Sequence, residues 1–402
     1  MKNIKKKLFF IIIILLILPV CIHAYDFGLT ANINAGLGNI YNDETKFDFG
    51  LNLWPYFSAL IGDSSEFIIS AGISLGYGTG EFYFIPELLR TEFTTRFGTS
   101  RISAGRINYT DPLSFIASGL FDGVQYFHSS GIGNFNAGVW YTGLLYKKNA
   151  NIVMTNNDIE GFIKPVESFN TYFAPRRLFT SIGWEHPSVG EMVHLNTAFI
   201  AQFDLTGADK KYHNQYFIVK ASMPLNNFLF TLGGSLELSQ YTGVENNIAF
   251  AGEAGIFWLF PGEFNSQLSF TGIIAGGRVD GVCDAFVPIT SKYYGYILKH
   301  KMSGLSVFTV DYSRRFSSSV GASFTASYFV RNDLGTFTGY PAYPQSGGYF
   351  LGPEILASAT WRPASDLLLS ISGGLFIPAL GNAGPNETVQ WRAELSAVMS
   401  LY

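Results

Sequence analysis

From Tyr25 onward the chain consists of segments in which apolar residues alternate singly with small or polar ones. The final segment, VQWRAELSAVMSLY at 389–402, is typical, because all its odd-numbered positions are apolar. Successive side chains of a β-strand point to opposite faces, so each segment has one apolar and one polar face. No fifteen-residue window shows the 3.6-residue period of an amphipathic helix. The sequence therefore predicts an all-β protein.

The segments are long for a soluble sandwich. Segment 65–78 runs for 14 residues, whereas soluble strands average about five to six and a tilted membrane-spanning strand needs about 9–11. Their polar faces carry Gly, Ser, Thr and Asn, and only 14% of the chain is charged, against about 25% in ordinary globular proteins. Aromatic residues stand near segment ends and are expected to form interfacial girdles: Trp54, Tyr56, Trp258, Phe260 and Trp361. These features predict a single transmembrane antiparallel β-barrel, because lipid tolerates no open sheet edge.

The number of segments can be counted. They are predicted at 26–39, 46–61, 65–78, 88–98, 100–108, 121–129, 133–146, 177–186, 191–204, 214–224, 227–240, 247–259, 263–278, 304–315, 319–331, 350–362, 366–377 and 388–402. The predicted number of strands is about eighteen, with sixteen possible. Because either number is even, both chain ends are expected on the periplasmic side. Connections after even strands are short, and the long ones, 148–176, 279–303 and 332–349, follow odd strands.

The two ends of the chain indicate export and assembly. Four lysines precede an apolar run from Leu8 to Val20, which predicts a signal peptide over 1–24, cleaved between Ala24 and Tyr25. A lipoprotein signal with lipidated Cys21 is the weaker alternative, and after cleavage only Cys283 remains. The barrel then covers 25–402. Its last strand, ending in Tyr402, is the expected recognition element for the barrel-assembly machinery, although Tyr402 falls on the face opposite to Leu401.

Charged residues opposite the apolar face are predicted to line the pore. The positive candidates are Arg90, Arg96, Lys220, Arg331, Arg362 and Arg392, with Arg278 less certain in phase, and the negative ones are Glu92, Glu237, Glu253, Glu354 and Glu394. Rings of fixed charge select solutes by sign. A charge network that braces the wall is an equally good interpretation of these residues.

Loop 109–120, YTDPLSFIASGL, is too apolar to extend into water. Folding into the barrel mouth would bury Phe115 and Ile116 and make Asp111 and Pro112 part of a constriction, while packing over the rim is the alternative. Loop 148–176 is polar enough to be either exposed or a second constriction.

Other functions find little support. His128, Ser129 and His194 lack the spacing of a catalytic triad, and neither a cofactor motif nor a metal-ligand spacing is present. The net charge of −4 favours no nucleic-acid partner. The partners expected are outer-membrane lipid, the assembly machinery and small hydrophilic solutes.

Residues 100–127 resemble a known family. SRISAGRINYTDP followed by GLFDGVQYF is similar to the alginate-export and OprD-like group of 18-stranded porins, in which a Gly-Arg strand leads to a Pro-containing loop and Phe-Asp-Gly-Val opens the return strand. The matching residues are Gly105, Arg106, Asp111, Pro112, Phe121, Asp122, Gly123 and Val124. The resemblance implies that Arg106 lines the pore beside an inward loop. It does not transfer alginate, because this lumen lacks a dense cationic patch.

The sequence thus predicts a porin-like outer-membrane channel, not an enzyme, for passive or selective diffusion of small hydrophilic solutes. The alternative is a surface-exposed barrel that acts as an adhesin or structural protein through its outer loops.

Overall fold

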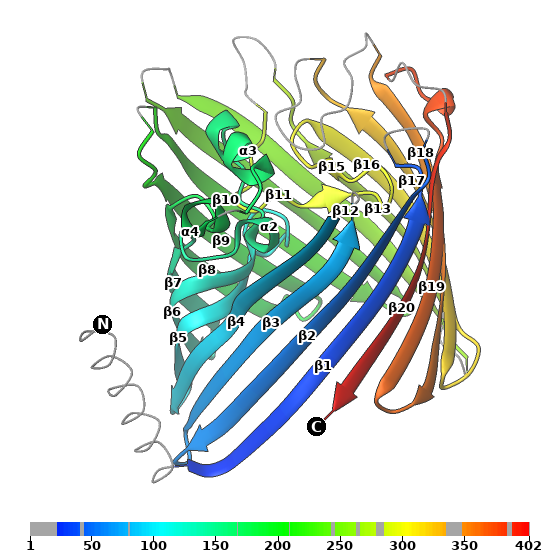
Figure 1. Ribbon diagram of the computed structural model, residues 1–402. Helices are drawn as coiled ribbons and strands as arrows, with labels where there is room; N and C mark the ends of the chain where they lie inside the picture. Colours follow the sequence, from blue (N-terminus) through cyan, green and yellow to red (C-terminus); the bar gives the residue numbers. More distant parts are fainter. Residues whose placement is uncertain are drawn as a thin grey trace.

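Eighteen antiparallel strands form one closed barrel in the computed structural model (Figure 1). The structure describes residues 22–40, 44–78, 81–166, 168–208, 210–242, 246–262, 266–278, 285–334, 348–383 and 388–401. The wall strands are β1 (Ile22–Gly38), β2 (Lys46–Ile61), β3 (Ser65–Gly78), β4 (Glu81–Phe97), β5 (Ser100–Thr110), β6 (Ser118–Ser130), β7 (Gly133–Tyr141), β8 (Arg177–Val189), β9 (Val193–Asp204), β10 (Tyr212–Leu225), β11 (Phe228–Tyr241), β12 (Asn247–Phe260), β13 (Ser266–Ala275), β16 (Leu305–Arg315), β17 (Val320–Arg331), β18 (Phe350–Ala364), β19 (Leu367–Phe376) and β20 (Gln390–Leu401). Each strand pairs with its chain neighbour, and β20 closes the ring on β1.

The predicted fold class and the count of eighteen are confirmed. Two boundaries were wrong by five residues or more, and several others by three or four. β4 begins at Glu81 rather than at 88, because Pro86 and a register shift beside Leu89 interrupt an alternation that begins earlier. β7 ends at Tyr141 rather than at 146, where the chain turns into the barrel mouth.

The register fixes which face each residue occupies. Outward residues such as Ile33 and Leu395 are apolar and exposed, while the paired Asn34 and Ser396 face the lumen. The rings of Trp258 and Phe260 contact each other on the outside, as a girdle requires. Trp54 pairs with Thr30 on the lumen face, so the girdle prediction is wrong for Trp54 and for Tyr56, two positions along the same strand.

Connections differ between the two ends of the barrel. At one end, which we call the turn end, short turns such as 62–64, 98–99 and 190–192 join the strands, and the chain finishes there (Figure 1). At the opposite, loop end the connections reach 35 residues in 142–176 and 29 in 276–304. This is the asymmetry that the sequence predicts.

Three loop-end segments fold into the barrel mouth. They are 111–117, which we call L3; 142–176, called L4, with α2 (Lys147–Ala150), α3 (Asn156–Ile163) and α4 (Phe169–Tyr172); and 285–304, called L7, with the small hairpin of β14 (Tyr293–Tyr294) and β15 (His300–Lys301). The connection after β19 holds a short 3-10 turn, Pro378–Leu380. Residues of L3, L4 and L7 share a hydrophobic core with lumen-facing wall residues, including Tyr216, Ile218 and Ala251.

Local sequence explains helix α3. The Thr155 side chain caps the N-terminus of the helix by accepting the Asp158 N–H. The Asp158 carboxylate in turn accepts the Thr155 N–H, and the two bonds form a capping box. At eight residues, this helix is too short to show a periodicity in the sequence. Among the described residues, no helix has the length and hydropathy needed to span a bilayer.

Several expectations concern the chain ends. Residues 1–21, with Cys21, as well as Cys283 and Tyr402, lie outside the described residues. β1 begins at Ile22, whose Cα pairs with that of Ile61, so cleavage after Ala24 would shorten it by three residues. That cleavage stays a prediction.

Candidate channel and its constriction

L3 folds into the barrel rather than over its rim. Phe115 is 1% exposed and Ile116 is fully buried, and the Phe115 ring meets that of Phe286 in L7 edge-on at 6.5 Å between centroids. The loop holds its own shape through Asp111, whose carboxylate accepts the N–H groups of Leu113, Ile116 and Ala117 at 2.8–2.9 Å. Burial raises the pKa of Asp111, and these N–H groups oppose that rise. Pro112 is half-buried at the start of the loop.

L7 is fastened to the wall by two carboxylates that the sequence predicts to line the pore. Glu354 on β18 is 4% exposed and accepts the N–H groups of Tyr296, Ile297 and Leu298 at 2.5–2.9 Å. Glu237 on β11 is fully buried and accepts the Val287 N–H at 2.7 Å. Both carboxylates do face inward, but they lie beneath a loop and are removed from water.

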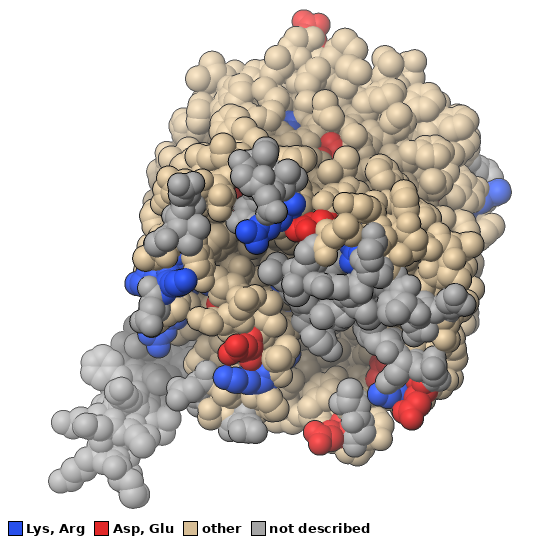
Figure 2. All heavy atoms as spheres, turned by 90° about the horizontal axis from the view of Figure 1, so that it is seen from above, with Lys and Arg blue, Asp and Glu red and all other residues tan. Residues whose placement is uncertain are grey.

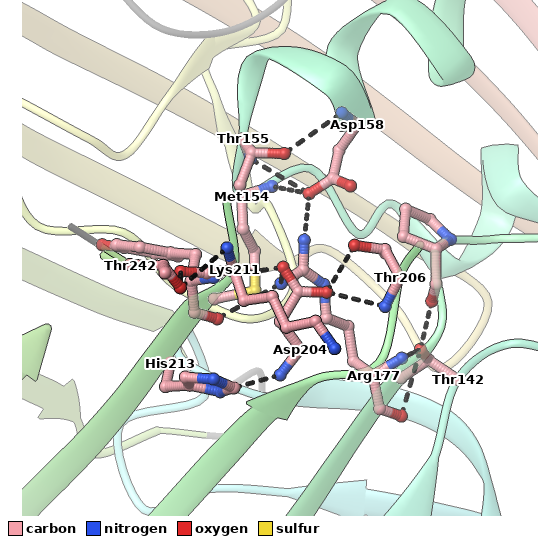
Figure 3. Close-up of polar contacts among 12 residues, drawn as sticks. Thr142, Met154, Thr155, Asp158, Arg177, Asp204, Thr206, Lys211, His213 and Thr242 are labelled. Carbon is pink, nitrogen blue, oxygen red and sulfur yellow. Dashed lines mark hydrogen bonds and ion pairs between the residues drawn. The ribbon is translucent and has the colours of Figure 1, made fainter. Parts of the chain in front are cut away.

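L4 is fastened by a buried arginine (Figure 3). Arg177, at the start of β8, is fully buried, and its guanidinium lies 2.7 Å from Asp158 of α3 and 2.9 Å from Asp204 at the end of β9. Asp158 also accepts the N–H groups of Met154 and Thr155. One cation therefore joins two wall strands to the helix that covers them.

The three loops also bind one another. The Thr290 N–H of L7 donates to the Ile116 carbonyl of L3 at 3.0 Å, and the Ser291 N–H donates to the Asn151 carbonyl of L4 at 2.8 Å. Ser118, at the start of β6, donates its N–H to the Thr290 hydroxyl at 2.9 Å. L3, L4 and L7 therefore form one packed body in the mouth, which contacts wall strands from β5 to β13 and, through L7, also β16 to β19.

Other predicted pore residues pair on the lumen wall. Arg392 on β20 contacts Asp48 of β2 at 2.6 Å and Glu394 at 3.0 Å. Lys220 on β10 contacts Glu253 of β12 at 2.7 Å. Arg90 contacts Glu92 at 2.5 Å on β4. These groups keep part of their surface exposed to the lumen.

The remaining predicted residues lie elsewhere. Arg331 is fully buried at the loop end of β17 and donates to the Gly348 carbonyl. Arg278 lies beyond β13, and its backbone N–H donates to the Asp333 carboxylate. Arg96 and Arg362 are exposed at the turn end. Arg96 and Arg362 thus lie at the opposite end of the barrel from L3, L4 and L7. The contribution of all four residues to solute passage stays a prediction.

Arg106 is not a water-lining residue. It is 6% exposed, and its guanidinium makes two parallel bonds to Asp122 at 2.9 and 3.0 Å and donates to the carbonyls of Leu88 and Leu144. The register places it opposite Asp122, one position out of phase with the inward Ile107. The role implied by the resemblance is therefore corrected: Arg106 ties β5, β6 and L4 together inside the wall.

Sequence reasoning missed Asp48, Asp158, Arg177 and Asp204. Asp48 alternates in phase with Gly50 and Asn52 and could have been found from that signal. Asp158, Arg177 and Asp204 meet only because L4 folds inward, and no local sequence pattern predicts this folding. Within the described ranges, no three His, Cys, Asp or Glu residues gather as a metal-ligand set.

L7 should loosen in acid. His300 is 3% exposed, and burial lowers its pKa from 6.5 to about 4, with the charges of Lys301 and Arg331 adding to the effect. Because the folded pKa lies below the unfolded one, L7 keeps its full stability above about pH 6.5 and loses up to about 3 kcal/mol as the pH falls toward 4. We expect amide exchange at 296–301 to accelerate over this window. His300→Gln should remove that pH dependence, and an unchanged profile in this variant would contradict the assignment.

From the loop end, charged side chains appear as small groups, some of one sign and some of both, separated by uncharged surface (Figure 2). The described surface at this end therefore carries no broad patch of one sign.

Comparison with known proteins supports the fold. No protein-family model and no curated protein sequence matches the chain. Among solved structures, Pseudomonas aeruginosa OccK2 (OpdF) in complex with glucuronate has a TM-score of 0.62 at 13% identity, covering 94% of this chain and 98% of that one. OprD of P. aeruginosa has a TM-score of 0.60 at 12% identity, covering 95% of this chain and 94% of that one. Acinetobacter baumannii OccAB4 has a TM-score of 0.56 at 10% identity, covering 94% of this chain and 98% of that one.

The chain thus has the fold of the OprD and Occ outer-membrane barrels, with eighteen strands. The resemblance that residues 100–127 suggest is confirmed at the level of the fold.

Proposed function

We propose that this protein is a bacterial outer-membrane channel through which small hydrophilic solutes diffuse. The observation that carries the proposal is the lumen face itself, where polar and paired charged side chains line the wall beside the packed loops. A closed barrel of this strand number is wide enough for an aqueous path. Proteins of the same fold include OprD and OccK2, one structure of which contains glucuronate.

The location follows from the same features. An exported chain with an apolar outer face and no open sheet edge is suited to the outer membrane, with the turn end toward the periplasm. The signal at 1–24, cleavage between Ala24 and Tyr25, contact with outer-membrane lipid and recognition of the last strand by the assembly machinery are parts of this proposal.

The adhesin alternative lacks support. It requires outer loops that are free to meet a host or matrix surface, whereas L3 and much of L7 are buried inside the barrel. The similar structures include the outer membrane protein OprD and the glucuronate-bound OccK2.

Planar-bilayer recording of the purified, full-length barrel tests the channel. We expect stepwise conductance that scales with salt concentration, together with swelling of liposomes in an isotonic solution of a small sugar. A correctly folded barrel that gives neither current nor swelling would refute the proposed function.

A further inference from the structure

We propose that the lumen is electrically compensated and therefore favours uncharged, hydroxyl-rich solutes, such as sugars, over their anionic counterparts. This inference rests on the proposed channel function and names the solute class that the channel takes. It follows from three cations of the wall, Arg392, Lys220 and Arg90, which each contact a carboxylate, and from the uncharged groups that lie between them.

The first cation is Arg392. Its guanidinium on β20 extends across β1 to reach Asp48 on β2, with both Nη atoms on the carboxylate at 2.6 and 2.8 Å. The crossing is possible because β1 has Gly36 at that point: a Cβ there would stand 2.4 Å from Nη2 of Arg392 and 2.9 Å from Asp48. Glu394 adds a second carboxylate, bonded at 3.0 and 3.2 Å.

The second cation repeats the arrangement on another part of the wall. Lys220 on β10 reaches Glu253 on β12 at 2.7 Å. The residue between them on β11 is Gly233, whose Cα is paired with both positions. A Cβ on Gly233 would stand 2.4 Å from Cδ2 of Leu113 in L3 and 3.4 Å from Cγ of Glu253. In both places a cation and a carboxylate meet across a glycine on the intervening strand.

The other inward charges do not restore a positive field. Arg90 pairs with Glu92 along β4, and Asp311 on β16 accepts a bond from Thr325. Lys299, at the tip of L7, has its pKa lowered by burial and by the charge of Arg392, while Glu394 and Asp48 oppose that shift. Arg96, Arg101, Arg315 and Arg362 lie at the turn end, away from L3, L4 and L7.

Uncharged hydrogen-bonding groups occupy the wall between these pairs. Inward hydroxyls bond across neighbouring strands as Ser370 with Ser396 at 2.6 Å, Ser323 with Ser358 at 2.8 Å and Thr309 with Ser327 at 2.9 Å, and Ser74 donates to Asn52 at 2.7 Å. Hydroxyls both donate and accept, so they can exchange partners with a passing polyol at little cost. A carboxylate solute, by contrast, would have to compete with the carboxylates that already hold the cations.

Two sugars that differ by one carboxylate test the inference. We expect liposomes containing the full barrel to admit glucose faster than glucuronate by about fivefold, the factor that a contact between two unit charges gives in water. In a potassium chloride gradient the reversal potential should indicate weak cation preference. Faster entry of glucuronate, or clear anion selectivity, would overturn the inference and leave the channel function intact. A barrel without any conductance would instead refute the channel function.

Releasing a cation provides the second arm. In the double variant Asp48→Asn and Glu394→Gln, Arg392 loses its carboxylates, and we expect the glucose-to-glucuronate ratio to fall by about fivefold. The matched control carries Asp366→Asn and Glu191→Gln in turn-end connections, which makes the same change in net charge away from the paired cations. A double variant that behaves like this control would show that pairing of Arg392 does not set the selectivity.

Discussion

Replacing Arg177 with methionine should destabilise the barrel by about 3–5 kcal/mol, because it leaves Asp158 and Asp204 as buried carboxylates without their cation. Methionine approximates the length of the side chain, so the lost volume is small and the lost charge dominates. Urea unfolding of the purified barrel in lipid vesicles, followed by tryptophan fluorescence, measures the change.

The neighbouring residue provides the control. Arg176 is exposed at the same strand end, so Arg176→Met removes the same charge without burying an unpaired group and should shift stability by less than about 1 kcal/mol. Equal effects of the two substitutions would contradict the role assigned to the buried cluster.

Replacing Glu354 with glutamine should free L7 from the wall. The amide offers a single oxygen where two carboxylate oxygens now accept the N–H groups of Tyr296, Ile297 and Leu298, and its NH₂ group turns toward those donors. Bonds to a charged acceptor contribute about 1.5–3 kcal/mol each. A loss of about 3 kcal/mol would speed amide exchange at 296–298 roughly a hundredfold.

The same variant should change the current. A mobile L7 is expected to raise the mean single-channel conductance and the open-channel noise, because this loop narrows the mouth. Glu191→Gln in a turn-end connection is the matched control and should leave both unchanged. A Glu354→Gln barrel with native exchange rates at 296–298 would show that other contacts hold the loop.

The wall was largely predictable. In segments such as 65–78 and 227–240, alternation alone identified the strands and their faces, because the two-residue period of a strand is a local property of the chain. The register shift beside Leu89 shows the limit, since a single extra residue changes the phase without changing the composition.

The charged site was predictable only in part. Arg392, Glu394, Lys220 and Glu253 could be placed on the inner face by phase. Which of them pair could not be predicted, because Arg392 meets Asp48 two strands away and 344 positions earlier in the chain. Glu237 and Glu354 also lie on the inner face by phase, but their carboxylates accept backbone N–H groups of L7.

The sequence by itself therefore determined the class of fold, a strand number of about eighteen and the face of most wall residues, because the alternation that carries this information is local to the chain. Only the tertiary structure decided which inward charges meet water, which meet each other across a glycine, and which are covered by L3, L4 and L7. Ring closure and loop packing bring together residues that lie far apart in the sequence, and the contacts that result leave no periodic signal.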